Sequence, residues 1–323
     1  MSAAEAFASE AIRIGISSCL LGSLVRYDGG HKRDAFLVDT FGRYVEWVPI
    51  CPELEIGLGV PRPTLRLQRD RTGMRLVMPS TDDDYTDAMN RYAERRVRQL
   101  EAFHLCGYVL KKDSPSCGME RVKVYDGPGP PKRDGRGLFA VALRRRFTDL
   151  PVEEEGRLND PSLRDNFVER VFAYRRLRSL FTPGWKLGDL VAFHTVHKLQ
   201  VMAHSPTHYA ELGRLVANAK AGSRVAVRRQ YENLFMSALT ILATPRRHTN
   251  VLQHVAGYFK RQFDAASRQE LAALIDDYRN GLVPLIVPIT MIRHYARHFS
   301  ESYLQGQTYL EPHPRELMLR NHV

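Results

Sequence analysis

The chain has 323 residues, of which 44% are hydrophobic, and a net charge of +11. Its length exceeds the usual size of one domain, so we expect two. It has no run of about 18 apolar residues, and its first ten residues lack the basic start and apolar block of a signal peptide. We therefore expect no membrane span and a cytoplasmic location. The positive charge indicates a polyanionic partner, with nucleic acid the first candidate.

An α/β domain is predicted over residues 12–150, after a short N-terminal tail at 1–11. Residues 127–135, rich in Gly and Pro, predict a surface loop. Strands alternating with helices indicate a parallel sheet with helices on both faces. Short apolar segments bounded by turn-forming or charged residues predict strands at 12–16, 44–50, 75–78 and 107–110, and helical spacing of apolar residues predicts helices at 84–104 and 137–147.

The second half of the chain is predicted to be all-α. Pro and acidic residues at 151–161 indicate a linker, and residues 162–311 then read as helices joined by short connections, as in a helical bundle. The polar segment 312–323 is expected to form a loosely held C-terminal tail. The expected helices span 166–180, 186–204, 225–242, 250–263, 269–278 and 284–299.

Three of the four cysteines follow predicted strands. Cys19, Cys51 and Cys117 each lie in a turn just beyond a short apolar segment. In parallel sheets the functional crevice lies beyond the carboxyl ends of the strands, so we expect these thiols to share one site. Cys106 precedes a strand and is predicted to be a small core residue.

Three shared thiols are able to bind a tetrahedral zinc ion or an iron–sulfur cluster. Separations of 32 and 66 residues are unlike the close pairs of zinc ribbons or the tight run of ferredoxins. A set of three protein ligands leaves one metal position open, which is typical of catalytic sites. The spacing alone also leaves open that these are ordinary buried cysteines.

Four motifs carry a resemblance to a known family. Residues 12–148 resemble the TudS-type thiouracil desulfidases, and the helical half resembles the YbgA-type domain. The two-domain combination resembles the RudS-type bacterial desulfidases, which remove sulfur from 4-thiouridine in tRNA. The motifs are Ser17-Ser-Cys-Leu-Leu-Gly22, Val25-Arg-Tyr-Asp-Gly29, Cys51-Pro-Glu53 with Gly57, and Ser114-Pro-Ser-Cys-Gly118.

The resemblance implies a [4Fe–4S] cluster held by Cys19, Cys51 and Cys117, with the fourth iron free. It also implies that Glu53 activates water for attack on C4 of the pyrimidine. Ser114, or less readily Ser116, would hydrogen-bond the ring or assist proton transfer, and the sulfur would leave as hydrogen sulfide. The residues themselves allow simpler roles, because Glu53 could stabilise a helix after Pro52 and Ser116 could close a turn.

Basic residues suggest how nucleic acid would bind. Lys111 and Lys112 are expected at the rim of the crevice, in reach of phosphates, and Arg26 and Tyr27 follow the first cysteine turn, where a ring could stack on an extruded base. In the helical half, basic residues near aromatic ones suit contact with RNA, although they could equally form a solvated face. These are Arg224, Arg228, Arg229, Arg246, Arg247, Lys260 and Arg261.

The sequence thus favours a cytoplasmic tRNA 4-thiouridine desulfidase with a [4Fe–4S] cluster. A second hypothesis keeps the chemistry and makes free thiouracil or a thionucleoside the substrate. A third is a redox-sensing iron–sulfur protein that binds nucleic acid, and a fourth is a structural zinc protein. The oligomeric state is not predicted.

Overall fold

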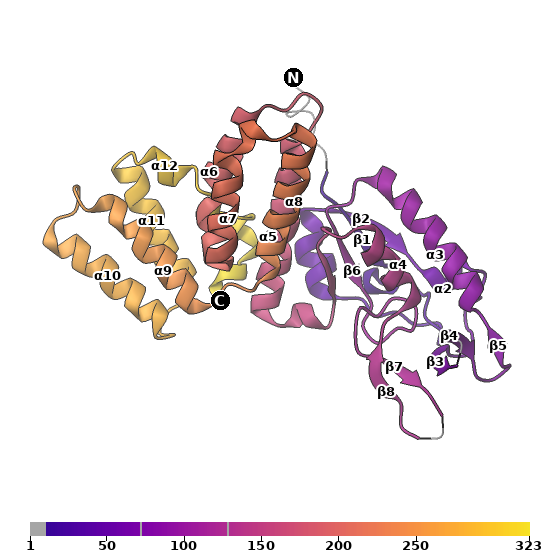
Figure 1. Ribbon diagram of the computed structural model, residues 1–323. Helices are drawn as coiled ribbons and strands as arrows, with labels where there is room; N and C mark the ends of the chain where they lie inside the picture. The colour runs from indigo at the N-terminus through magenta and orange to yellow at the C-terminus, as the bar shows by residue number, and fades with distance from the viewer. Residues whose placement is uncertain (1–10, 72, 128) are drawn as a thin grey trace. The chain divides into compact units, whose positions relative to one another are not determined.

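The computed structural model describes residues 11–71, 73–127 and 129–323, which belong to two compact units (Figure 1). The α/β unit spans 11–159 and the helical unit begins at Asp160. The predicted N-terminal tail, 1–11, lies outside the described residues except for Ala11. Residues 151–161 are not the linker that was predicted, because 152–154 form a strand of the central sheet.

A four-stranded parallel sheet forms the centre of the α/β unit, which confirms the predicted fold class. Its order is β2-β1-β6-β9. The strands are short and mostly buried, as in parallel sheets covered on both faces. They are β1 (Arg13–Ser17), β2 (Glu46–Ile50), β6 (Gly107–Leu110) and β9 (Val152–Glu154).

The connections between these strands create a crevice at one edge of the sheet. The chain passes from β1 to β2 on one side, then crosses back past β1 to β6 and on to β9. Because such crossovers are right-handed, η2 (Phe36–Thr40) covers one face, and α3 (Thr86–Leu100) and α4 (Leu138–Arg146) cover the other. The connection from β1 leads to one side of the sheet and the connection from β6 leads to the other, so the strand order reverses between these two strands. Ligands bind at such a switch point.

A second, five-stranded sheet in the α/β unit was largely missed by the sequence analysis. Its order is β5-β4-β3-β7-β8, and only β4 was predicted. The predicted loop 127–135 is wrong at its end, because residues 132–135 form the edge strand β8. Its three exposed charged residues show no alternation of apolar and polar positions, which is common in edge strands and hid it in the sequence. The strands are β3 (Arg66–Asp70), β4 (Gly73–Met78), β5 (Asp83–Asp84), β7 (Val122–Tyr125) and β8 (Lys132–Gly135).

The helical unit packs its helices around two apolar cores. Many helices begin as helix-start signals require, with a Ser, Thr or Asp side chain accepting a backbone hydrogen bond from the first turn. No helix in the described part of the chain is both long and apolar enough to span a membrane. The helices are α5 (Pro161–Leu180), α6 (Leu187–His204), α7 (Pro206–Ala217), α8 (Arg224–Thr240), α9 (Pro245–Ala256), α10 (Ala265–Arg279), α11 (Ile286–His298) and α12 (Ser302–Gln305).

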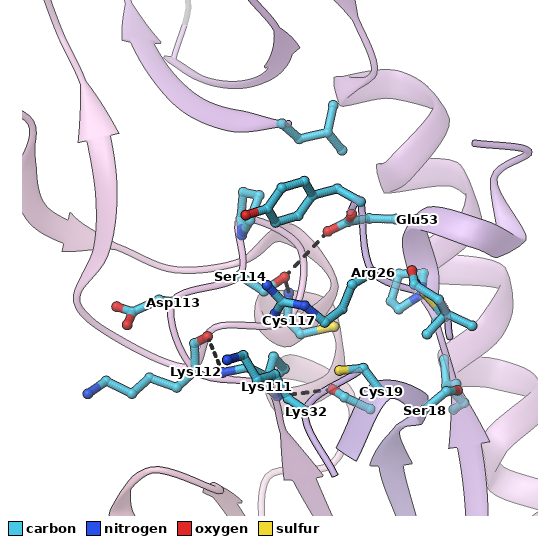
Figure 2. Close-up of a pocket in the computed structure, with 18 of the residues that line it drawn as sticks. Ser18, Cys19, Arg26, Lys32, Glu53, Lys111, Lys112, Asp113, Ser114 and Cys117 are labelled. Atoms are coloured by element: carbon cyan, nitrogen blue, oxygen red, sulfur yellow. Dashed lines mark hydrogen bonds between the residues drawn. The ribbon is translucent and has the colours of Figure 1, made fainter. Parts of the chain in front are cut away.

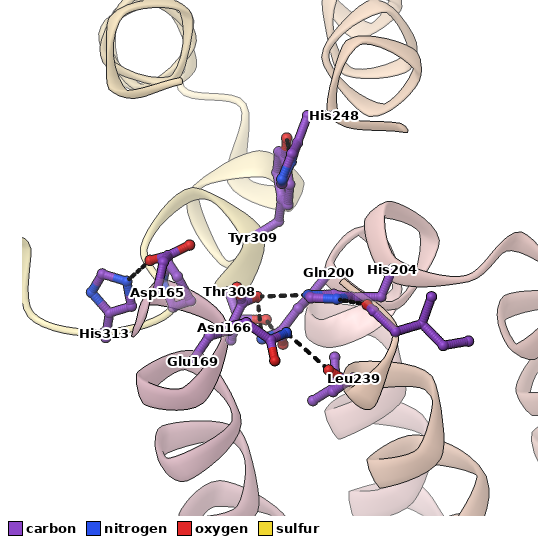
Figure 3. Close-up of polar contacts among 12 residues, drawn as sticks. Asp165, Asn166, Glu169, Gln200, His204, Leu239, His248, Thr308, Tyr309 and His313 are labelled. Atoms are coloured by element: carbon purple, nitrogen blue, oxygen red, sulfur yellow. Dashed lines mark hydrogen bonds and ion pairs between the residues drawn. The ribbon is translucent and has the colours of Figure 1, made fainter. Parts of the chain in front are cut away.

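The prediction of a loose C-terminal tail is wrong. The side chain of Arg320 is 4% exposed, and its guanidinium lies 3.6 Å from Glu169 Oε2 and 4.0 Å from Asp165 Oδ2. His313 Nε2 lies 2.7 Å from Asp165 Oδ1 (Figure 3). The segment is polar in sequence and yet held in place, because His313 and Arg320 contact buried carboxylates of α5. The pKa of Glu169 lies well below its usual value, since His204 and Arg320 outweigh the effect of burial.

Removing the Arg320 side chain should therefore destabilise the helical unit. The Arg320→Ala variant leaves two buried carboxylates short of a cation, which costs about 3–5 kcal/mol. Arg315→Ala is the matched control in the same segment, because the Arg315 side chain is 69% exposed, and should change stability by less than about 0.5 kcal/mol. Urea unfolding followed by circular dichroism measures both. Equal urea midpoints for Arg320→Ala and Arg315→Ala would contradict a structural role for Arg320.

Candidate active site

A cavity of about 330 Å³ opens beyond the carboxyl ends of β1, β2 and β6, at the switch point of the sheet (Figure 2). Three cysteines line it. Cys19 lies in η1 (Ser18–Leu21) directly after β1, Cys51 lies between β2 and α2 (Pro52–Glu55), and Cys117 lies in the turn after β6. The parallel topology thus brings together thiols that are far apart in sequence.

Burial keeps these thiols protonated when nothing binds them. It raises the pKa of Cys19 to about 11, an effect opposed by the positive charge of Lys111. Burial also raises the pKa of Cys51, and it raises that of Cys117 well above the ordinary value although Ser17 donates a hydrogen bond that lowers it. None of the three forms a disulfide bond. A metal or cluster bound here must displace protons, because the thiolate is the ligand.

Cys106 lies elsewhere. It precedes β6 and is 3% exposed, and its Sγ lies 3.8 Å from the His104 carbonyl oxygen. The start of β6 is the opposite end of the strand from the cavity. Cys106 therefore occupies the core, as predicted.

The arrangement of the thiols bears on the kind of metal they could bind. Within residues 11–71, 73–127 and 129–323, no group of three or more His, Cys, Asp or Glu side chains converges to hold a single ion. A zinc ion would need its sulfur ligands to meet at about 2.3 Å from one point. Three thiols that line one cavity also fit an iron–sulfur cluster, in which each thiolate binds a separate iron.

Glu53 projects into the same cavity from the first turn of α2. Its Oε1 accepts a hydrogen bond from Ser116 Oγ at 3.0 Å and lies 3.5 Å from Ser114 Oγ. The alternative role of stabilising the helix start falls to Glu55, whose Oε1 accepts from the Cys51 backbone N–H at 3.2 Å. The Glu53 carboxylate is thus directed at the two serines that the sequence singled out.

The two serines differ in what they can reach. Ser114 lines the cavity, and its Oγ accepts from the backbone N–H groups of Ser116 and Cys117 at 3.2 and 3.0 Å. Ser116 is fully buried. The start of α4 packs directly on this turn, since a Cβ at Gly137 would lie 2.4 Å from the Ser116 carbonyl oxygen. Ser114 is therefore placed to touch a ligand, and Ser116 to orient Glu53.

Arg62 is a site residue that sequence analysis missed. Its side chain is only 5% exposed and holds Glu53 Oε2 through two N–H groups, at 2.6 and 3.2 Å. It also donates to the carbonyl oxygen of Val25 at 3.1 Å, which ties the loop after Cys19 to the carboxylate. The surrounding Val60-Pro-Arg-Pro63 reads only as a turn, so nothing in the sequence indicated a buried arginine.

The four predicted rim residues all line the cavity, but they are not equally available. Arg26 pairs with Asp28 at 3.3 Å, and its guanidinium lies 5.3 Å from the centre of the Tyr27 ring, which is 42% exposed. Lys111 forms an ion pair with Glu155. Lys112 is exposed. The ammonium group of Lys111 thus already has a partner within the protein, and its contact with phosphate stays a prediction.

The basic residues predicted in the helical unit lie on separate elements, at the starts of α8 and α9 and after Phe259. Arg228 pairs with Glu232 at 3.0 Å, and Arg247 donates to the carbonyl oxygen of His204 at 2.9 Å. The arginines of 224–229 lie at the start of α8, whose 17 residues span about 25 Å before the chain reaches Arg246. The exposed members are Arg224, Arg228, Arg229, Arg246, Lys260 and Arg261.

Comparisons with known proteins match both units. Residues 14–155 match the 2-thiouracil desulfurase family, and residues 198–314 match a family of unknown function, DUF1722. The uncharacterized protein YbgA of Escherichia coli is 40% identical over 161 residues, covering 49% of this chain and 94% of YbgA. The chain belongs to the proteins that join a TudS-type desulfidase domain to a YbgA-type domain. The α/β unit is thus a desulfidase domain of the thiouracil type.

Two further proteins resemble the TudS-type unit. The uncharacterized protein YbbK of Bacillus subtilis is 28% identical over 154 residues, which cover 45% of this chain and 97% of YbbK. A solved structure of a [4Fe-4S]-dependent thiouracil desulfidase, TudS, is 32% identical with a TM-score of 0.40, covering 49% of this chain and 99% of that one.

Proposed function

We propose that the protein is a cytoplasmic tRNA desulfidase that converts 4-thiouridine to uridine and releases hydrogen sulfide. The observation that carries this proposal is the cavity itself, in which three thiols, Glu53 and Ser114 meet at the switch point of the sheet. Membership of the desulfidase family gives the class of reaction, and the residues in the cavity provide a base and hydrogen-bond donors for it.

Cys19, Cys51 and Cys117 are the residues that would hold a [4Fe–4S] cluster. Their chemistry fits, because such clusters are bound by thiolates and the three sulfurs come from three separate strand ends around one cavity. When bound, the cluster would supply an open iron that acts as a Lewis acid toward the thiocarbonyl sulfur.

The reaction is a hydrolysis and needs no electron transfer. Glu53 Oε1 would take one proton from water while the water oxygen forms a bond to C4. The C–S bond would then break, the oxygen would lose its second proton as the C4 carbonyl forms, and both protons would leave with the sulfur as hydrogen sulfide. Ser114 lies 3.5 Å from the same oxygen and would donate a hydrogen bond to the ring or move the proton. Arg62 would hold the other carboxylate oxygen, so that Oε1 keeps its direction.

Two features support tRNA as the substrate. The net charge of +11 favours a polyanion. A free thiopyrimidine would need only the TudS-type unit, and relatives such as YbbK match that unit over nearly their whole length. The YbgA-type unit therefore requires a role of its own, and binding of tRNA would give it one. Free thiouracil or a thionucleoside remains the second candidate.

Turnover on three substrates tests the proposal. Protein reconstituted without oxygen is incubated with 4-thiouridine-containing tRNA, with 4-thiouridine and with 2-thiouracil, and the sulfide and the uridine or uracil formed are measured. We expect kcat/KM to be highest for tRNA. Equal or higher values for the free compounds would replace tRNA by the second candidate, and absence of sulfide from all three would reject a desulfidase.

Arg62 should matter for turnover rather than for assembly. In the Arg62→Ala variant Glu53 Oε2 loses both of its guanidinium donors, and a misplaced catalytic group costs roughly 10²-fold in rate. Arg62→Lys keeps the positive charge but not the planar guanidinium, so its rate should lie between those of the wild type and Arg62→Ala. Sulfide release is measured at matched iron content, with Arg69→Ala, on an exposed part of β3, as control. A normal rate in Arg62→Ala would show that Glu53 needs no such partner.

A further inference from the structure

A second cavity lies in the helical unit, between α9 and α10, which lie side by side (Figure 1). The two helices run antiparallel, because Tyr278 near the end of α10 packs against His248 near the start of α9. The cavity has a volume of about 220 Å³. Its apolar wall comes from both helices and from the turn that joins them, and it consists of Ala256, Phe263, Leu271 and Ile275.

The two ends of this cavity carry opposite charge. Lys260 and Arg268 line one end, where an Arg268 N–H donates to the carbonyl oxygen of Lys260 at 3.3 Å. Asp276 lines the cavity just over two helical turns further along α10, which is about 12 Å. Because the helices are antiparallel, Gln253 of α9 lines the cavity toward the same end as Asp276. A ligand that matches this cavity is therefore polar at both ends and apolar in between.

Charged groups at both ends are available to a ligand. Among residues 11–71, 73–127 and 129–323, the Asp276 carboxylate and the Lys260 ammonium group have no hydrogen bond or ion pair. Arg268 is partly offset by the carboxylate of Asp264, whose pKa is lowered by the Ser267 backbone N–H and, more weakly, by Arg268. One full negative charge and one full positive charge thus remain without a partner in the protein.

The middle of the cavity is kept open by Gly257 and Ala272, which both line it. Gly257 has φ −60° and ψ −24°, a conformation that any residue adopts. A Cβ at Gly257 would lie 4.0 Å from Lys260 Cε, which is an ordinary contact distance. Ala272 is an exposed position on α10. A larger side chain at either position would therefore fill the cavity without straining the backbone.

We infer that this cavity binds a guanine nucleotide, with the Watson–Crick edge of the base at Asp276 and the phosphate at Lys260 and Arg268. The inference deepens the proposed function, on which it rests only for the source of the nucleotide, an unpaired guanosine of tRNA. Lysine and arginine are the residues that bind phosphate, and the apolar wall gives the face of the ring a surface to pack on.

Guanine is the base that matches the Asp276 end. A carboxylate accepts hydrogen bonds and donates none. The Watson–Crick edge of guanine presents two adjacent donors, at N1 and at the 2-amino group. Adenine, cytosine and uracil each place an acceptor beside their donor, and that acceptor would face a carboxylate oxygen. Asp276 therefore favours guanine over the other three bases.

Binding of mononucleotides tests this inference without requiring turnover. Dissociation constants for GMP, AMP and guanosine are measured by calorimetry at fixed low salt. We expect the full-length protein to bind GMP at least ~10-fold more tightly than AMP or guanosine, as hydrogen bonds to charged groups predict. Asp276→Asn should lose the preference for GMP over AMP, and Lys260→Ala should narrow the gap between GMP and guanosine. Asp277→Asn removes the same charge from the neighbouring position of α10, which does not line the cavity, and should keep both preferences.

Ala272→Leu fills the cavity and should abolish GMP binding while the urea midpoint of unfolding stays that of the wild type. Equal binding of GMP and AMP by the wild type would overturn the inference, and so would unchanged GMP binding in Asp276→Asn or in a folded Ala272→Leu. A protein that prefers GMP and releases no sulfide from any thiolated substrate would reject the proposed reaction but not this cavity.

A second arm identifies the source of the nucleotide. It compares GMP with a single-stranded trinucleotide that has guanosine at its centre and uridine on both sides. Tighter binding of the trinucleotide would assign the cavity to unpaired guanosine of RNA. Equal or tighter binding of GMP would assign it to a free guanine nucleotide.

Discussion

Replacing any one of Cys19, Cys51 and Cys117 by alanine is expected to abolish both the iron–sulfur absorbance and the release of sulfide. Each thiol comes from a different strand end, so no neighbouring cysteine can take its place. Loss of one thiolate leaves a cluster with two protein ligands and a second exposed iron. The measurement is the visible absorbance and the iron content after anaerobic reconstitution, followed by the sulfide assay.

Cys106→Ala is the matched control for these variants. It removes a buried thiol of the same unit that does not line the cavity, so absorbance and turnover should both persist. If a Cys19, Cys51 or Cys117 variant kept its cluster and its activity, that residue would be removed from the proposed ligand set.

The second large effect is expected at Glu53. Glu53→Gln keeps the shape of the side chain and lets it remain beside Ser116 and Arg62, but it removes the base. Loss of a general base lowers the rate by about 10²–10⁴-fold. The cluster should assemble as in the wild type, because the three thiols are untouched.

The comparison for Glu53 is Glu55→Gln, two residues further along α2. Glu55 contacts the Cys51 backbone and the Tyr92 hydroxyl instead of the two serines. Single-turnover sulfide release at equal iron content separates the two variants. A Glu53→Gln enzyme as fast as Glu55→Gln would exclude Glu53 as the base.

The parts of the fold that the sequence predicts are those with a strong local signal. The strands that precede Cys19, Cys51 and Cys117 are short and apolar, and their parallel arrangement places all three turns at one edge. Most of the second sheet escaped prediction because its strands are short and interrupted by charged residues, as in Arg66-Leu-Gln-Arg-Asp70 of β3. The C-terminal segment was mistaken for a tail because the partners of Arg320 and His313 lie about 150 residues earlier, on α5.

Within the site, the features that the sequence does not show have a shared physical origin. Lys111 and Lys112 are adjacent and look alike in sequence, yet Lys111 is neutralised by Glu155, which lies in a segment that was predicted as a linker. Arg62 is buried by contacts with Val25 and Glu53, which are remote in sequence. Sequence motifs therefore locate the thiols and the carboxylate, but only the tertiary structure shows which cations remain free.

The most direct test of the account is the iron and acid-labile sulfide content of the wild-type protein purified without oxygen. If the three thiols hold one [4Fe–4S] cluster, the protein should be brown and should contain iron and acid-labile sulfide in equal amounts, as one cluster per chain requires. A colourless protein without iron, or one that contains zinc instead, would contradict it.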